Sequence, residues 1–98
     1  MLIGHNVEDG VLHLEILRDL DISSRAAATL EIEMLLFTHR PYSRVRVQLP
    51  TCDPSPASLS VLARARRLCG RRGIPLAVVG PPELRGRRAD RLSPVREV

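Results

Sequence analysis

The sequence predicts an α/β fold in which helices pack on a mixed or largely parallel sheet of four to five strands. One observation is that apolar and polar residues alternate over Val11–Leu17 and over Arg44–Leu49, which is the period of a half-exposed strand. A second is that a segment with apolar residues at helical spacing follows each of these stretches. The elements are expected in the order β-β-α-β-α-β-α, and strands that alternate with helices favour parallel neighbours.

The first seventeen residues predict a hairpin. Met1–His5 is expected to form a short strand, and Asn6–Gly10 a polar turn, because it ends in the strong turn dipeptide Asp9-Gly10. Val11–Leu17 is expected to pair with that first strand. On this second strand, Leu12, Leu14 and Ile16 share one face, and His13 and Glu15 share the other.

A first helix is predicted between the hairpin and the next strand. Ser23 or Ser24 is expected to cap it, and it should run to about Thr38, since Pro41 cannot continue a helix. Its apolar stripe is expected to consist of Ala27, Leu30, Met34 and Phe37, with Glu31 and Glu33 facing water.

The stretch Val45–Leu68 organises the rest of the chain. A strand ends by Pro50, a turn rich in Pro, Asp and Ser follows, and a helix is expected to begin near Ser58, with Ser55 or Ser58 as its cap. A strand, a tight turn and a helix N-terminus form a place where α/β proteins put binding sites.

The last third predicts one more strand and one more helix. The second helix should end around Arg71–Gly73, and Ile74–Val79 is almost entirely apolar, as expected of a strand covered on both faces. A short basic helix is expected over Glu83–Leu92, and Ser93–Val98 is expected to be frayed. The 98 residues are therefore interpreted as one domain, with its core between residues 10 and 92.

The charge of the chain is positive and unevenly distributed. The net charge is +4, all 15 basic residues are arginine, and ten of them lie from Arg64 onward. The basic second half favours an acidic partner or a phosphate backbone, or is simply the solvent face of two amphipathic helices. The use of arginine alone is typical of codon bias in a GC-rich bacterial genome.

Cofactor and metal chemistry is not expected. Cys52 and Cys69 fit no zinc or redox spacing and are interpreted as reduced thiols of a cytoplasmic protein. His5, His13 and His39 are expected to lie far apart, and no motif places a base beside a nucleophile, so no catalytic residues are predicted. No apolar run approaches the roughly 20 residues of a membrane span, and no signal peptide is recognisable.

The order of elements and several short motifs resemble the STAS domain, a family named for sulfate transporters and anti-sigma factor antagonists. The segment Arg18-Asp19-Leu20-Asp21 sits where the family has G-x-L-D. Val45–Leu49 is similar to the strand before the family's D-S-S-G-L turn, and Ser58–Leu62 is similar to the start of its second helix. Gly73–Val79 is similar to the glycine and strand that follow. The resemblance covers residues 10 to 92 and implies a STAS-like fold.

This chain departs from the family at the serine that its antagonists phosphorylate. That serine follows the Asp of D-S-S-G. A match anchored on Leu59 places Pro56 there, and a match anchored on Leu49 places Ala57 there, so neither has a hydroxyl. Ser55 and Ser58 are nearby phosphoacceptor candidates, although plain helix capping explains both.

The resemblance implies a regulatory protein that acts by binding and not by catalysis. It would be an anti-sigma factor antagonist that docks on a serine-kinase-type anti-sigma factor, without the usual serine switch. The alternatives are a non-phosphorylatable scaffold subunit that forms homo- or hetero-oligomers, such as a homodimer, and a basic nucleic-acid-associated protein. The family's mode of docking implies that the partner-binding residues are Asp19, Asp21, Ser23, Asp53, Ser55, Ser58, Leu59 and Leu62.

Overall fold

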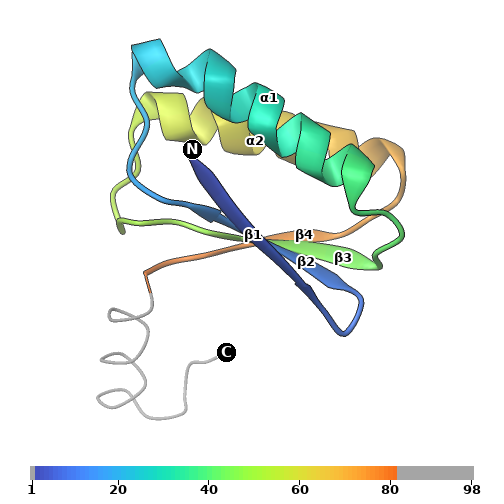
Figure 1. Ribbon diagram of the computed structural model, residues 1–98. Coiled ribbons are helices and arrows are strands. Elements are labelled where there is room, and N and C mark those ends of the chain that lie inside the picture. Colours follow the sequence, from blue (N-terminus) through green and yellow to red (C-terminus); the bar gives the residue numbers. More distant parts are fainter. Residues whose placement is uncertain (1, 82–98) are drawn as a thin grey trace, which may run out of the picture.

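The computed structural model describes residues 2–81, which form an α/β fold of one four-stranded sheet and two helices (Figure 1). The predicted helix over residues 83–92 and the predicted frayed end over residues 93–98 lie outside the described residues. The elements, in chain order, are β1 (Ile3–Glu8), β2 (Val11–Ile16), α1 (Ile22–Thr38), β3 (Arg44–Gln48), α2 (Pro56–Arg71) and β4 (Leu76–Val79).

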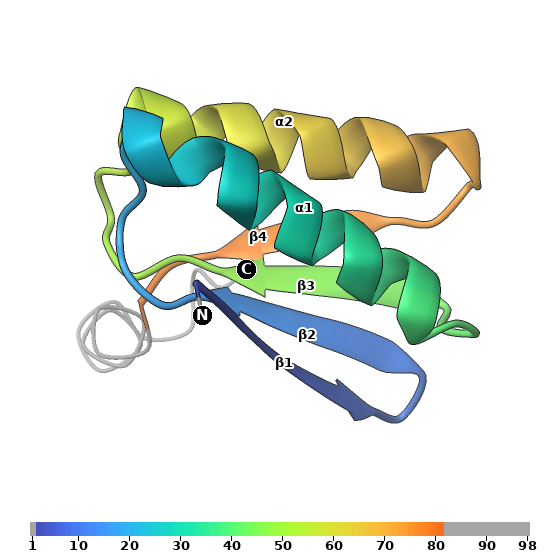
Figure 2. The ribbon, with the colours of Figure 1, turned by 45° about the horizontal axis from the view of Figure 1, so that its top comes forward.

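The sheet is mixed, as the sequence predicts, and its spatial order is β1-β2-β3-β4. Strands β1 and β2 are antiparallel, whereas β2, β3 and β4 run parallel to one another. Both helices cover the same face of the sheet and lie side by side (Figure 2). Because β2 and β3 are parallel, their carboxyl ends lie at the same end of the sheet, next to the first turns of α1 and α2.

The hairpin turn is shorter than predicted. Strand β1 extends to Glu8, and Asn6 pairs with His13, so most of the segment expected to be a polar turn belongs to the sheet. Asp9 and Gly10 make the turn alone, with φ of 53° and 76°, which is the backbone that a two-residue hairpin requires.

The core lies between the sheet and the helices. Alternate residues of the central strands are buried under the helices, as the alternation predicts. The buried strand residues are Ile3, Leu12, Leu14, Ile16, Val45 and Val47. Strand β4 differs from the prediction, because Ala77 is exposed and both helices lie on the opposite face of the sheet.

The apolar stripe predicted for α1 exists, but it does not face the core. Ala28, Ile32 and Leu36 are buried, and the predicted stripe of Ala27, Leu30, Met34 and Phe37 faces outward instead. Helix α1 has apolar residues on two faces, so periodicity alone does not decide which face is inside.

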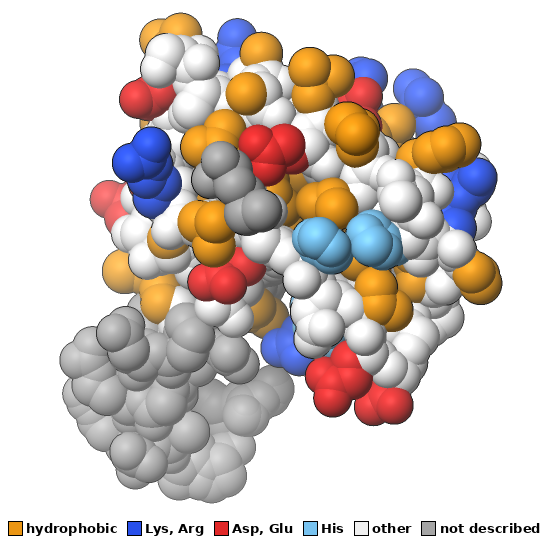
Figure 3. Space-filling model, viewed as in Figure 1, with side chains coloured by type: hydrophobic (Ala, Val, Ile, Leu, Met, Phe, Trp, Pro, Cys, Tyr) orange, Lys and Arg blue, Asp and Glu red, His pale blue; other side chains and the backbone are white. Residues whose placement is uncertain are grey.

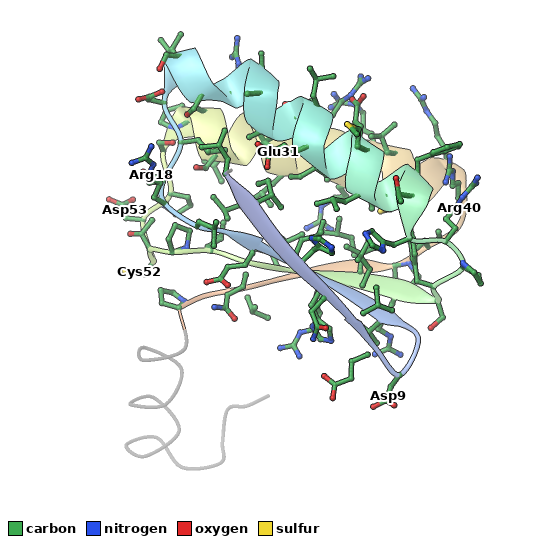
Figure 4. All side chains as sticks on the ribbon, in the orientation of Figure 1. Asp9, Arg18, Glu31, Arg40, Cys52 and Asp53 are labelled. Carbon is green, nitrogen blue, oxygen red and sulfur yellow. The ribbon has the colours of Figure 1, made fainter. Side chains whose placement is uncertain are left out.

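A carboxylate of α1 helps to hold the helix in this orientation. Glu31 was expected to face water, but its Oε1 accepts hydrogen bonds from the backbone N–H groups of Leu2 (3.1 Å) and Ile3 (3.0 Å). These contacts hold the start of β1 against α1 (Figure 4). In the same orientation the face that carries Ile32 and Leu36 is turned toward the sheet.

Helix α2 begins earlier than predicted and otherwise follows its pattern. It starts at Pro56, with Ser55 as its N-cap, because Pro lacks an N–H group and suits the first helical position. Its inner face contains Ala57, Ser58, Val61, Leu62, Ala65 and Cys69.

Candidate functional site

The loops that leave β2 and β3 form the candidate site. Residues 17–21 lead into α1 and residues 49–55 lead into α2, and both loops lie at the same end of the sheet. Arg18, Cys52 and Asp53 lie together at this end in Figure 4. The resemblance predicts these two loops as neighbours, and the structure brings them together.

Asp19 connects the two loops. Its Oδ1 accepts a hydrogen bond from the Ser58 hydroxyl at 2.7 Å and another from the backbone N–H of Ser55 at 3.1 Å. The Ser58 hydroxyl, followed by the Ser55 N–H, holds the pKa of Asp19 below its ordinary value, because both bonds favour the carboxylate. Asp19 is therefore an ionised acceptor at neutral pH and not a free general acid.

The two serines complete the connection. The Ser55 hydroxyl donates to the Leu20 carbonyl at 2.6 Å and accepts from the Ser58 N–H at 3.1 Å. The Ser58 hydroxyl accepts from the Leu20 N–H at 3.0 Å. Because the bonds cross between the loops in both directions, they fix the loops relative to each other.

Asp21 caps α1, in place of the predicted Ser23 or Ser24. Its Oδ1 accepts from the Ser24 N–H at 2.9 Å and from the Ser23 hydroxyl at 2.7 Å. The Ser24 hydroxyl in turn accepts from the Asp21 N–H, which completes a capping box. The Ser23 hydroxyl is the main cause of the lowered pKa of Asp21.

Exposure divides the predicted partner-binding residues into three groups. Ser58 and Leu62 are buried within the domain, so neither can contact a partner directly, and Ser58 is inaccessible to a kinase. Ser55 is half-buried and occupied as an N-cap. The exposed members are Asp19, Asp21, Ser23, Asp53 and Leu59.

The remaining candidate residues show no metal-binding cluster. Among residues 2–81, no group of three or more His, Cys, Asp or Glu side chains could hold a metal ion. Cys69 is buried, which raises the pKa of its thiol, and Cys52 is exposed. The expectation that the histidines lie far apart is wrong for two of them, since the rings of His5 and His39 are 4.6 Å apart (Figure 3).

Sequence reasoning missed a hollow of about 260 Å³ on the open face of the sheet. The alternation of β2 and β3, which places polar residues on that face, was the signal that could have found it. It lies on the face opposite the helices and is separate from the two loops. The polar side chains that line it include Asn6, His13, Glu15, Arg46 and Gln48.

Comparison with family models, with curated proteins and with solved structures gives no match for this chain. In the part of the chain that the structure describes, neither helix combines the length and apolar character needed to cross a membrane.

Proposed function

We propose that this chain is a STAS-like regulatory protein that binds a serine-kinase-type anti-sigma factor as an antagonist and performs no catalysis. The observation that carries the proposal is the bond network of Asp19, Ser55 and Ser58, which fixes two loops that the resemblance assigns to docking. A rigid loop pair loses little conformational entropy when a partner binds, so it suits recognition.

The contact surface of the proposed antagonist is smaller than the resemblance alone implies. Asp21, Asp53 and Leu59 are exposed around the fixed loops and provide two carboxylates and one apolar contact. Ser58 supports this surface from inside, because its hydroxyl is fully buried and already bonded to Asp19. The mixture of charge and one large apolar side chain is typical of a transient protein interface.

The proposed function also includes the absence of a phosphoswitch at the usual position. Pro56 and Ala57, which occupy that position in the two alignments, carry no hydroxyl. Incubation with the partner kinase and ATP should therefore leave the binding affinity unchanged. Stoichiometric phosphorylation of Ser55, abolished by Ser55→Ala, would show that the switch has moved instead, whereas Ser58 is buried and should not be modified in the folded chain.

Affinity capture from the native cell extract, followed by mass spectrometry, tests the partner. We expect recovery of a protein with a serine-kinase-type ATP-binding domain. Leu59→Arg should abolish recovery, since Leu59 is 52% exposed beside the fixed loops. Val7→Arg is the matched control, because Val7 is 43% exposed on the far strand β1. The absence of such a kinase, or equal loss with both variants, would refute the proposal.

A further inference from the structure

Helix α1 exposes a continuous apolar stripe on its outer surface. Ala26, Leu30, Met34 and Phe37 follow one another at intervals of three or four residues, so they share a face. Leu30, Met34 and Phe37 are 61%, 65% and 64% exposed. Single exposed apolar residues are ordinary, but a row of this kind marks an interaction site. No element among residues 2–81 covers the stripe, and hydrophobic side chains gather over α1 in Figure 3.

Helix α2 places a row of arginines beside this stripe. Arg64, Arg67 and Arg71 recur at intervals of three and four residues and are all exposed. The Arg64 Nε atom lies 2.9 Å from Glu33 Oε2 of α1, which fixes the row on the side of α2 next to α1. Within the described residues, Arg67 and Arg71 have no carboxylate partner.

The opposite flank of the stripe carries no such charge. Ala27, Glu31 and Thr38 lie on that flank at helical spacing, and the Glu31 carboxylate is occupied by the N–H groups of β1. Both helices run in the same direction across the sheet, so the apolar stripe and the arginine row extend alongside each other (Figure 2). The Arg40 guanidinium lies over the Phe37 ring, 4.9 Å from its centre, at the C-terminal end of the stripe. The surface therefore has an apolar ridge with a row of arginines along one flank and one further arginine at its end.

We propose that this surface binds an acidic amphipathic helix of another protein. The apolar side of that helix would cover Leu30, Met34 and Phe37, and carboxylates along one flank would pair with Arg67 and Arg71. An apolar face docked on a hydrophobic surface is a recurring mode of helix recognition, and charge on one flank sets its orientation. The proposal does not rest on the proposed function, because it uses none of the loop residues.

Charge disfavours a second copy of this chain as the occupant. An antiparallel pair of α1 stripes related by a two-fold axis keeps each flank on its own side, so the two arginine rows would face each other. A parallel pair would set each row against the partner's Ala27–Thr38 flank, which offers no free carboxylate. The chain's own last residues are themselves rich in arginine, with Arg85, Arg87, Arg88 and Arg91.

The same asymmetry disfavours an anionic membrane. A helix that lies on a bilayer has basic residues along its polar face, on both sides of the apolar stripe. Here the arginine row lies along the α2 flank, Arg40 lies at the end of the stripe, and the flank of Ala27, Glu31 and Thr38 has no basic residue. Glu33 adds a carboxylate at the border of the stripe. A partner with an equally one-sided arrangement of carboxylates fits the surface better.

The test is selection of a displayed library of random helical peptides against the full chain. We expect enriched peptides to combine apolar residues at spacing three and four with Asp or Glu on one flank. The double substitutions Met34→Ser/Phe37→Ser and Arg67→Glu/Arg71→Glu should each weaken binding of these peptides about tenfold or more. Val7→Ser and Arg44→Glu, at exposed positions of β1 and β3, are the matched controls and should change the affinity less than twofold.

Several outcomes would overturn the proposal. These are a failure to enrich any peptide, enrichment without acidic residues, and binding that the α1 and α2 substitutions leave intact. Sedimentation with phosphatidylglycerol vesicles that depends on Phe37 would assign the surface to a membrane, and a stable dimer in light scattering that Phe37→Ser dissolves would assign it to a second copy. Circular dichroism of each variant confirms that the fold is retained.

Discussion

Helices α1 and α2 cover the same face of the sheet, yet their apolar residues are distributed differently around the two helices. Helix α2 has one apolar face, which is buried, and a polar face rich in arginine. Helix α1 has apolar residues on two faces, and the larger side chains Met34 and Phe37 are on the outer one. The buried face of α1 is narrow and consists of Ala28, Ile32 and Leu36.

The difference teaches that an apolar stripe at helical spacing has two possible causes. In α2 the stripe is buried and forms part of the core of the domain. In α1 the outer stripe lies outside the core, where its apolar side chains remain in contact with water. Within residues 2–81 the Arg40 guanidinium lies over the Phe37 ring of this stripe. The four predictions below test the two helices and the loops that lead into them, from the largest expected effect to the smallest.

The two stripes of α1 should respond very differently to truncation. Ile32→Ala should lower the free energy of unfolding by about 2–5 kcal/mol, because Ile32 is 2% exposed and leaves a cavity. Leu30→Ala should change it by less than about 0.5 kcal/mol. Urea denaturation followed by circular dichroism measures both. Equal losses would mean that the stripe containing Leu30 is buried after all.

Two serines of α2 provide the next contrast. Ser58→Ala removes the acceptor of the buried Leu20 N–H and the donor to Asp19, and should cost about 1–3 kcal/mol of unfolding free energy. Ser60→Ala, at an exposed position of the same helix, should have almost no effect. The same denaturation experiment applies, and an insensitive Ser58 would show that the bonds between the loops add no stability.

The capping of α1 can be tested in a similar way. Asp21→Ala should cost about 0.5–2 kcal/mol, since it removes the carboxylate that accepts from the Ser24 N–H at 2.9 Å and leaves only the 3.2 Å bond to the carbonyl of residue 21. Ser23→Ala should cost less, because Ser23 donates to Asp21 but accepts nothing from the helix backbone. Thermal unfolding of the two variants ranks them, and the reverse order would assign the cap to Ser23.

The smallest effect concerns the pH dependence of stability that Asp19 produces. The pKa of Asp19 is lower in the folded chain than in the unfolded chain, so its ionisation stabilises the fold. This contribution is complete above the ordinary aspartate pKa of about 4 and is lost as the pH falls through the lower folded value. The stability of Asp19→Asn should therefore fall less steeply below about pH 4 than that of the wild type. Acid titration followed by circular dichroism measures this, and identical curves would contradict it.

The candidate site was only partly predictable from the sequence, because its residues act through contacts between distant parts of the chain. Asp19, Ser55 and Ser58 are polar residues at loop ends, and sequence reasoning could name them as candidates. Their roles depend on one another across nearly forty positions of the chain. Ser58 is buried and donates a hydrogen bond to Asp19, so it supports the loops from inside and is not part of the surface. Asp21 was likewise recognised as a loop carboxylate but not as the cap, since three cap-forming residues, Asp21, Ser23 and Ser24, compete within four positions.

The sequence by itself determined the elements and their order. Alternation in β2 and β3, the dipeptide Asp9-Gly10 and the prolines after β3 act over a few residues, so local sterics and hydrogen bonding suffice to fix them. Only the tertiary structure decided which face of α1 is inside. Glu31 reaches the N–H groups of Leu2 and Ile3, nearly thirty positions away, and such a contact exists only once the sheet is in place.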